Sequence, residues 1–141
     1  MTATGMFGVL ISYIPYLALL LRLVVGVTMM MHGYPKLKNP QQTVQWTKGL
    51  GVPAVATYLA IVLEFFGGIA IIIGLIVPIV AFFIALEMLG NALLKKTKMK
   101  SPYLVGQNAG AYEIDVTYLL LALTMIVLGA GAFSLGAFIG L

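Results

Sequence analysis

Four apolar runs constrain this chain more than any other feature, because each is long enough, or nearly so, to cross a bilayer. They cover about residues 13–34, 54–77, 79–94 and 112–133. A membrane-spanning helix needs about 20 predominantly apolar residues. Charged residues make up only 9% of the sequence, whereas a typical soluble domain has about 25%. We therefore expect residues 1–141 to form a single transmembrane domain, an all-α integral membrane four-helix bundle.

The composition also narrows the chemistry that the chain can support. It has no cysteine, which excludes disulfides, thiol relays and cysteine-ligated metals or clusters. It has one histidine, so no metal site is expected. The net charge of +4 does not indicate a nucleic-acid partner, because seven of the eight basic residues lie in two short loops beside membrane spans. The partner that the composition predicts is the lipid bilayer.

Lysines mark one side of the predicted membrane protein. In a four-span chain the first and third loops lie on the same side, and they hold every lysine: Lys36, Lys38, Lys48, Lys95, Lys96, Lys98 and Lys100. The opposite side has both termini and the turn at Val77-Pro78, without a charged residue. Cytoplasmic loops carry an excess of lysine and arginine. We predict a multi-pass protein of the cell membrane with its lysine-rich loops in the cytoplasm and both termini outside.

Three charged residues lie inside the predicted spans, namely Arg22, Glu64 and Glu87. A charge at the centre of a membrane helix costs about 2.5–3.5 kcal/mol on insertion scales, so each needs a partner or a function. They lie roughly 12, 10 and 8 residues from the lysine-side end of their spans, which places them within about 6 Å of one level. We expect an Arg22–Glu64 ion pair, with Glu87 sharing it or staying protonated. Catalysis and a purely structural clamp are both open for this pair.

A second polar cluster is expected nearer the lysine side, where the first span ends and the fourth begins. It contains His32, Lys36, Glu113 and Asp115. His32 and Lys36 are four residues apart, so both can reach the same neighbouring helix. A structural interpretation is equally open, because acids in a first turn complement the helix dipole.

Small residues indicate where the helices approach one another. One face of the first span carries small and charged residues at spacings of four and three: Arg22, Gly26, Met29, Gly33 and Lys36. In the second span, Gly67 and Gly68 also permit close backbone contact. Between these spans, residues 43–48 are expected to form a short interfacial helix with Trp46 at headgroup level.

These motifs, in this order, resemble the DoxX/DoxD family of small four-helix membrane proteins over about residues 21–135. The matching motifs are Arg22-x-x-x-Gly26, His32-Gly33-x-x-Lys36-Leu37, Gly51-Val52-Pro53, Glu64-x-x-Gly67-Gly68, Gly74-Leu75, Glu113 and Gly129-x-Gly131-x-x-Ser134. Glu87 does not match a position of the family pattern, and Val77-Pro78 replaces its usual Thr-Arg. The resemblance implies a membrane subunit linked to quinone redox chemistry, as in archaeal thiosulfate:quinone oxidoreductase.

Two hypotheses follow from the residues and the resemblance together. In the first, the chain is an oxidoreductase subunit of a respiratory complex, with no covalently bound cofactor but with a quinone between its helices. Glu64 or Glu87 would exchange protons and Arg22 would orient a carbonyl, while further contacts come from Gly26, His32, Lys36, Gly67, Gly68, Glu113 and Asp115. In the second, the chain is a non-catalytic accessory subunit of a terminal oxidase or another respiratory assembly. Other membrane subunits, and possible copies of the same chain, are the expected protein partners.

Overall fold

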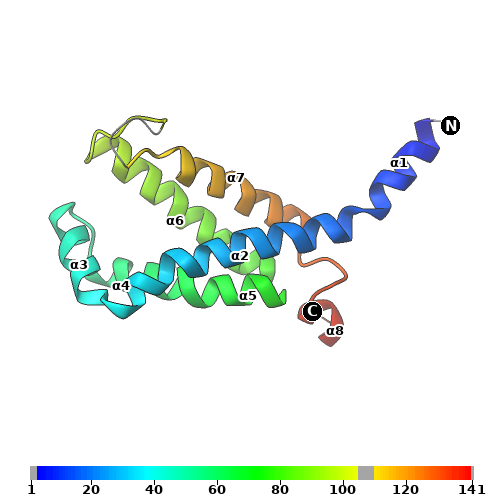
Figure 1. Ribbon diagram of the computed structural model, residues 1–141, viewed down its shortest axis with the longest axis horizontal. Helices are drawn as coiled ribbons and strands as arrows, with labels where there is room; N and C mark the ends of the chain where they lie inside the picture. Colours follow the sequence, from blue (N-terminus) through cyan, green and yellow to red (C-terminus); the bar gives the residue numbers. More distant parts are fainter. Residues whose placement is uncertain (1–2, 105–109, 141) are drawn as a thin grey trace.

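The computed structural model describes residues 3–104 and 110–140, and within these ranges every regular element is a helix. The elements are α1 Ala3–Ser12, α2 Ile14–Lys38, α3 Pro40–Gly49, α4 Ala54–Val62, a π-helical turn η1 Leu63–Gly67, α5 Gly68–Ile73, α6 Val77–Thr97, α7 Glu113–Leu128 and α8 Leu135–Ile139. Because α4, η1 and α5 follow without a break, they form one continuous helix. The predicted all-α architecture is confirmed (Figure 1).

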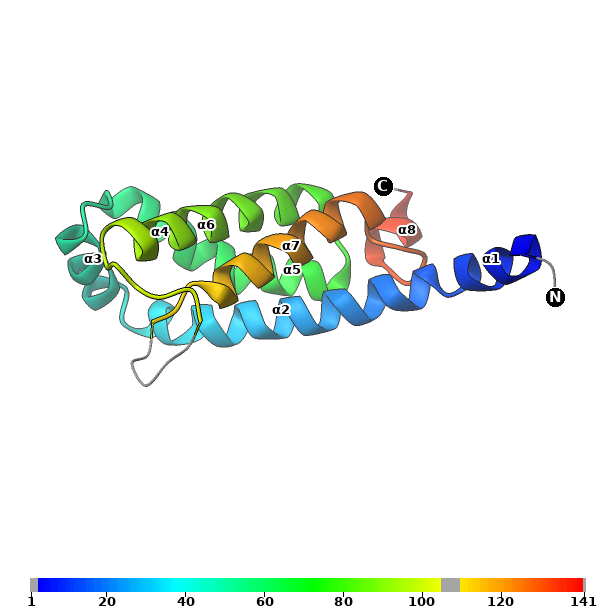
Figure 2. The same cartoon turned by 90° about the horizontal axis from the view of Figure 1, so that it is seen from above.

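Three of these helical stretches have the length and apolar composition to cross a membrane: Ile14–Lys38, Ala54–Ile73 and Val77–Thr97. The fourth member of the bundle is α7, which has 16 residues and packs mainly against α6 and also against α2. The long helices lie side by side, with α3 at one end of the bundle and α1 and α8 at the other (Figure 2). The lysine-bearing ends of α2 and α6 lie at the α3 end.

The observed helix boundaries differ from the predicted spans at Pro35, Gly74 and Pro78. α2 continues through Pro35 to Lys38, although the residue before a proline usually disfavours helix. The second membrane helix ends at Ile73 and is followed by Gly74, whose φ of +76° glycine adopts without strain. The turn therefore precedes Pro78, which lies in the first turn of α6, where its missing N–H is tolerated. A helix was expected over residues 43–48, and the observed helix α3 extends over Pro40–Gly49.

Close backbone contact joins α2 to the α4–η1–α5 helix. A Cβ atom built on Gly26 would lie 2.7 Å from the carbonyl oxygen of Gly68, and one built on Gly68 would lie 2.7 Å from that of Gly26. A Cβ atom on Gly33 would lie 2.7 Å from the backbone nitrogen of Phe65. The predicted packing role of this face of α2 is confirmed, because Arg22, Gly26, Met29 and Gly33 are all buried.

Candidate functional site

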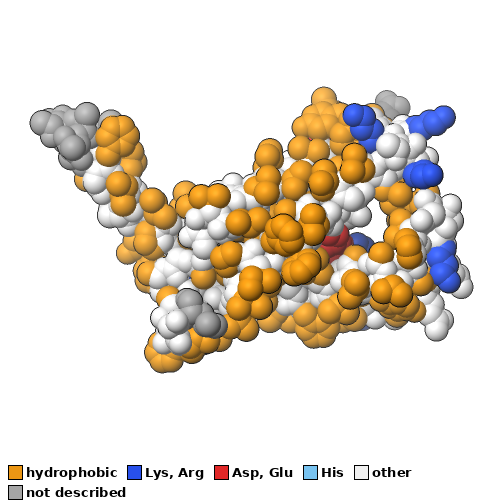
Figure 3. Space-filling view, turned by 180° about the vertical axis from the view of Figure 1, so that it is seen from behind, with side chains coloured by type: hydrophobic (Ala, Val, Ile, Leu, Met, Phe, Trp, Pro, Cys, Tyr) orange, Lys and Arg blue, Asp and Glu red, His pale blue; other side chains and the backbone are white. Residues whose placement is uncertain are grey.

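The lysine-side half of the bundle contains a cavity of about 970 Å³ between α4–η1 and α6. Its walls are largely apolar, with Leu59 and Phe66 on one side and Phe83 on the other, and Trp46 of α3 lies at its lysine-side end. The space-filling view shows an opening between the helices, with acidic side chains visible inside it and basic side chains at the nearby end of the molecule (Figure 3). The cavity therefore joins an apolar entrance to a charged interior.

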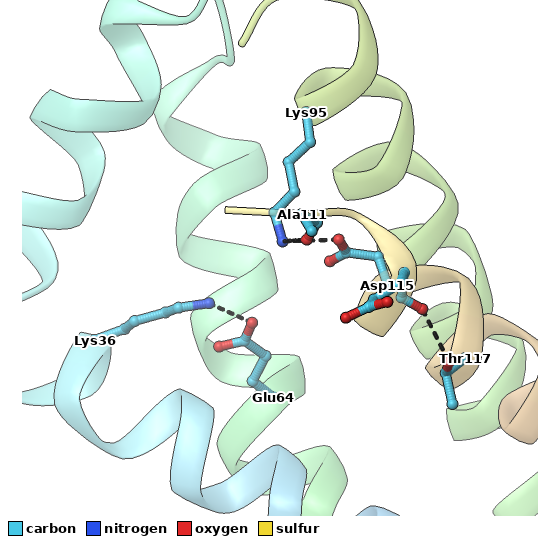
Figure 4. Close-up of polar contacts among 7 residues, drawn as sticks. Lys36, Glu64, Lys95, Ala111, Asp115 and Thr117 are labelled. Atoms are coloured by element: carbon cyan, nitrogen blue, oxygen red, sulfur yellow. Dashed lines mark hydrogen bonds and ion pairs between the residues drawn. The ribbon is translucent and has the colours of Figure 1, made fainter. Parts of the chain in front are cut away.

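Glu64 is the most deeply buried acid of this cavity. Its side chain lies on the π-helical turn η1, and only 2% of the residue is exposed. Such turns are rare and occur frequently at functional sites. Atom Oε1 accepts a hydrogen bond from Lys36 Nζ in an ion pair (Figure 4). Atom Oε2 is buried and has no hydrogen-bond partner among the described residues.

Glu87 brings a second carboxyl group to the same place from α6. Its side chain lines the same cavity as those of Glu64, Lys36 and Asp115. Its Oε2 atom is also buried without a partner in the described part of the chain. Two carboxylates close together in a buried site repel each other, and this favours one proton on the pair. The Glu64–Glu87 pair can therefore hold one proton at the wall of the cavity.

A second ion pair closes the lysine side of the cavity. Lys95 Nζ lies 2.7 Å from Asp115 Oδ2 and also 3.5 Å from the carbonyl oxygen of Ala111, so it ties the end of α6 to the start of α7 (Figure 4). Together the cavity holds two lysines and three acids, which are Lys36, Lys95, Glu64, Glu87 and Asp115. One proton on the acid pair would make this cluster neutral, as burial of charge favours.

Of the other residues predicted to contact a ligand, some line the cavity and others lie at helix contacts or at the start of α7. His32 lines the cavity and makes an edge-to-face contact with Tyr118, with ring centroids 6.5 Å apart. Glu113 lies in the first turn of α7, and its carbonyl accepts a hydrogen bond from the Thr117 hydroxyl. Gly67 lines the cavity, whereas Gly26 and Gly68 lie at the α2–α5 contact. Within the described residues, no three His, Asp or Glu side chains are arranged to hold a metal ion.

The predicted Arg22–Glu64 pair is wrong. Arg22 is 2% exposed and donates hydrogen bonds to four backbone carbonyls, those of Ile71, Ile72, Ala130 and Phe133. Arg22 lies 16 residues before the end of α2 at Lys38, or roughly 24 Å along the helix. Glu64 instead lies against Gly33, nearer that end. The helix continues past the predicted end at Tyr34, and its extension brings Lys36 to Glu64.

The four carbonyls around Arg22 are available because two helices end beside it. α5 ends at Ile73, which leaves the carbonyls of its last turn without helical partners. α7 ends at Leu128, and the following segment places the other two carbonyls against the guanidinium group. This cluster thus joins α2, α5 and the segment before α8, and it lies outside the residues that line the cavity. Its geometry fits the structural clamp that the sequence left open.

Lys95 is a site residue that the sequence analysis interpreted only as a topology signal. The pattern that could have revealed it is the spacing of Glu87, Asn91 and Lys95, which places all three on one face of α6. All three line the cavity. Trp46 was also placed by sequence only at headgroup level, and it lines the cavity because α3 folds against α4. A hydrogen bond of 2.6 Å between the Thr47 and Thr57 hydroxyls supports that contact.

Fold and site define a multi-pass α-helical membrane protein with a buried acid pair in an intramembrane cavity. Comparison with known protein families places the chain more closely, because the DoxX family matches residues 17–97. The chain belongs to the DoxX family. The matched segment runs from α2 to α6, and so contains Lys36, Glu64 and Glu87.

Two relatives illustrate the relationship. The chain is 28% identical over 121 residues to the Bacillus subtilis (strain 168) protein named "Putative oxidoreductase CatD", covering 86% of this chain and 85% of the relative. It is 31% identical over 121 residues to "Inner membrane protein YqjF" of Escherichia coli (strain K12), covering 83% of this chain and 87% of the relative. No solved structure gives a significant match.

Proposed function

We propose that this chain is the quinone-binding membrane subunit of a respiratory oxidoreductase, and that its ligand ring occupies the cavity between α4–η1 and α6. The observation that supports this most is the buried Glu64–Glu87 pair, in which two carboxyl oxygens at the wall of an apolar cavity lack partners among the described residues. Charged groups inside membrane segments are rare, and they typically mark substrate paths or proton relays. The oxidoreductase name of the Bacillus relative agrees with this proposal.

The cavity fits a ring with an apolar tail in size and in chemistry. Small-molecule sites usually enclose about 300–1,000 Å³ and are lined mainly by apolar side chains with a few polar groups. The volume of about 970 Å³ and the Leu59, Phe66 and Phe83 walls meet both conditions. A bound quinone would supply two-electron, two-proton redox chemistry. A lipid-soluble ligand could enter from the bilayer through the opening between the helices (Figure 3).

The residues of this chain bind the ring and handle protons, while electrons come from a partner subunit with its own redox cofactor. In this proposal the acid pair carries one proton, and Lys36 compensates the charge of Glu64. Lys95 and Asp115 extend the polar wall to the lysine end. By the positive-inside rule this end is cytoplasmic, so the site would exchange protons with the cytoplasm. Thiosulfate oxidation is one reaction that such a subunit could serve.

A non-catalytic accessory role is the second candidate, and the Arg22 cluster favours it. There a buried charge serves only to join three chain segments. If the acid pair did the same, ligand binding would be absent. The two functions are therefore separated by whether the cavity binds a quinone ring.

The test uses Trp46, the single tryptophan of the chain, which lines the cavity. Short-chain ubiquinone and menaquinone analogues are titrated into the purified protein while Trp46 fluorescence is recorded. We expect saturable quenching in the wild type and none in Gly90→Phe, because a Cβ atom at Gly90 meets no heavy atom within 4 Å and the larger side chain can fill the cavity. Gly49→Phe, on open space in α3, is the control. Unsaturable quenching, equal in wild type and Gly90→Phe, would support the accessory role.

A further inference from the structure

Two carboxyl oxygens at the cavity wall have no hydrogen-bond partner among the described residues. Glu64 Oε2 and Glu87 Oε2 are both buried and both can accept a hydrogen bond. The lysines of the cavity are already used, because Lys36 pairs with Glu64 Oε1 and Lys95 pairs with Asp115. A buried acceptor without a donor is unfavourable. A ligand that donates a hydrogen bond therefore supplies what this wall lacks.

A hydroxyl is also the better partner when Glu87 carries a proton. A ligand hydroxyl between the two carboxyl groups accepts from the protonated Glu87 and donates to Glu64 Oε2, because a hydroxyl is both donor and acceptor. A ligand carbonyl can only accept, so it leaves Glu64 Oε2 facing another oxygen. In both protonation states the hydroxyl satisfies more of the buried atoms than the carbonyl does.

We propose that the cavity selects the quinol, the hydroxyl-bearing reduced form of its ligand, over the quinone, and that Glu64 Oε2 and Glu87 Oε2 make this selection. The inference rests on the proposed function, since it concerns the same cavity and the same class of ring. It adds that this chain stabilises the reduced form, so a complex built around it would release the oxidised form more readily.

Three ligands with one ring and one short tail test the selection: the quinone, its quinol, and the dimethyl ether of that quinol. Each is titrated separately and without oxygen into the purified full chain by isothermal titration calorimetry. We expect the quinol to bind at least about tenfold more tightly than the quinone, which corresponds to about one satisfied buried hydrogen bond. The dimethyl ether retains the ring but has no donor, and so should bind no better than the quinone. Equal or tighter binding of the quinone would overturn the inference.

A conservative variant assigns the selection to the acid pair. Glu87→Gln replaces a carboxyl oxygen with an amide N–H donor of nearly the same shape, so the preference for quinol should disappear or reverse. Thr124→Val removes an exposed hydroxyl on α7, outside the residues that line the cavity, and should keep the preference. An unchanged preference in Glu87→Gln would also overturn the proposal.

The possible outcomes show whether the proposed quinone-binding function, the quinol preference, or both are wrong. If none of the three ligands binds to the wild type, both the function and the selection are wrong. If all three bind and the quinone binds most tightly, the binding function stands and only the selection is wrong. If Glu87→Gln does not fold, the comparison of quinol with its dimethyl ether in the wild type still decides the matter.

Discussion

The two ends of the bundle hold their buried charges in opposite ways. At the α8 end, the Arg22 guanidinium group is surrounded by four backbone carbonyls, which use all three of its nitrogen atoms. At the lysine end, Glu64 and Glu87 each have a buried oxygen beside the cavity that no described residue contacts by a hydrogen bond. Sequence alone treats these residues as one group of intramembrane charges. In the structure they form two separate clusters. The nitrogen atoms of Arg22 all have carbonyl partners, whereas the acid pair keeps hydrogen-bonding capacity beside a cavity.

This difference indicates which buried charge can bind a ligand. A charge whose hydrogen-bonding capacity is used by the protein can stabilise the fold but has little left for another molecule. A charge with unused capacity beside a cavity can bind, exchange a proton, or do both. The number of hydrogen-bonding atoms that already have partners therefore distinguishes the two roles. It assigns a structural role to Arg22 and a ligand-binding role to the acid pair.

The largest effect on stability is expected from Arg22→Leu. This change removes the guanidinium group and leaves the carbonyls of two helix ends without donors, and a hydrogen bond to a charged group contributes about 1.5–3 kcal/mol. We expect a loss of about 3 kcal/mol or more in the free energy of unfolding, measured by thermal denaturation in detergent. Ligand affinity of the folded fraction should stay unchanged. A stable variant that no longer binds quinone would show that Arg22 belongs to the site.

A smaller effect is expected where the backbones of α2 and α5 touch. In Gly68→Ala the new methyl group would lie 2.7 Å from the carbonyl oxygen of Gly26, so the helices must move apart. Overpacking of this kind costs about 1–3 kcal/mol. Gly90→Ala is the matched control, because its methyl group meets no heavy atom within 4 Å, and alanine in a helix is favoured over glycine by roughly 0.5–1 kcal/mol. Equal melting temperatures of the two variants would contradict the packing described here.

The smallest effect is expected from the ion pair that joins α2 to η1. Lys36→Met leaves Glu64 without its partner, but the Lys36 side chain is 38% exposed, so solvent screening limits the loss to about 1 kcal/mol. The double variant Lys36→Met/Glu64→Gln should recover part of this loss, because the buried charge is then removed as well. A double-mutant cycle of unfolding free energies measures the coupling. Strictly additive losses would show that the pair does not stabilise the fold.

Sequence could predict the helices and the inward face of α2, because apolar length and the four-three spacing from Arg22 to Gly33 are local patterns. It also predicted the meeting of Glu64 and Glu87 from their depths. It could not predict the partners of Arg22, since these are backbone carbonyls that become available only where α5 and α7 end. The predicted first span ended at Tyr34, before Pro35, whereas α2 continues to Lys38. The depth of Arg22 was counted from that early end, so the prediction placed Arg22 too close to the level of the acids.

Labelling with a photoactivatable quinone analogue tests the distinction between the two ends most directly. The purified chain is irradiated with the probe, with and without excess unmodified quinone, and the labelled peptides are identified by mass spectrometry. The account predicts competable labelling within Ala54–Gly67 and Val77–Thr97, which line the cavity. Competable labelling confined to the segments around Arg22, at the end of α5 and between α7 and α8, would contradict it.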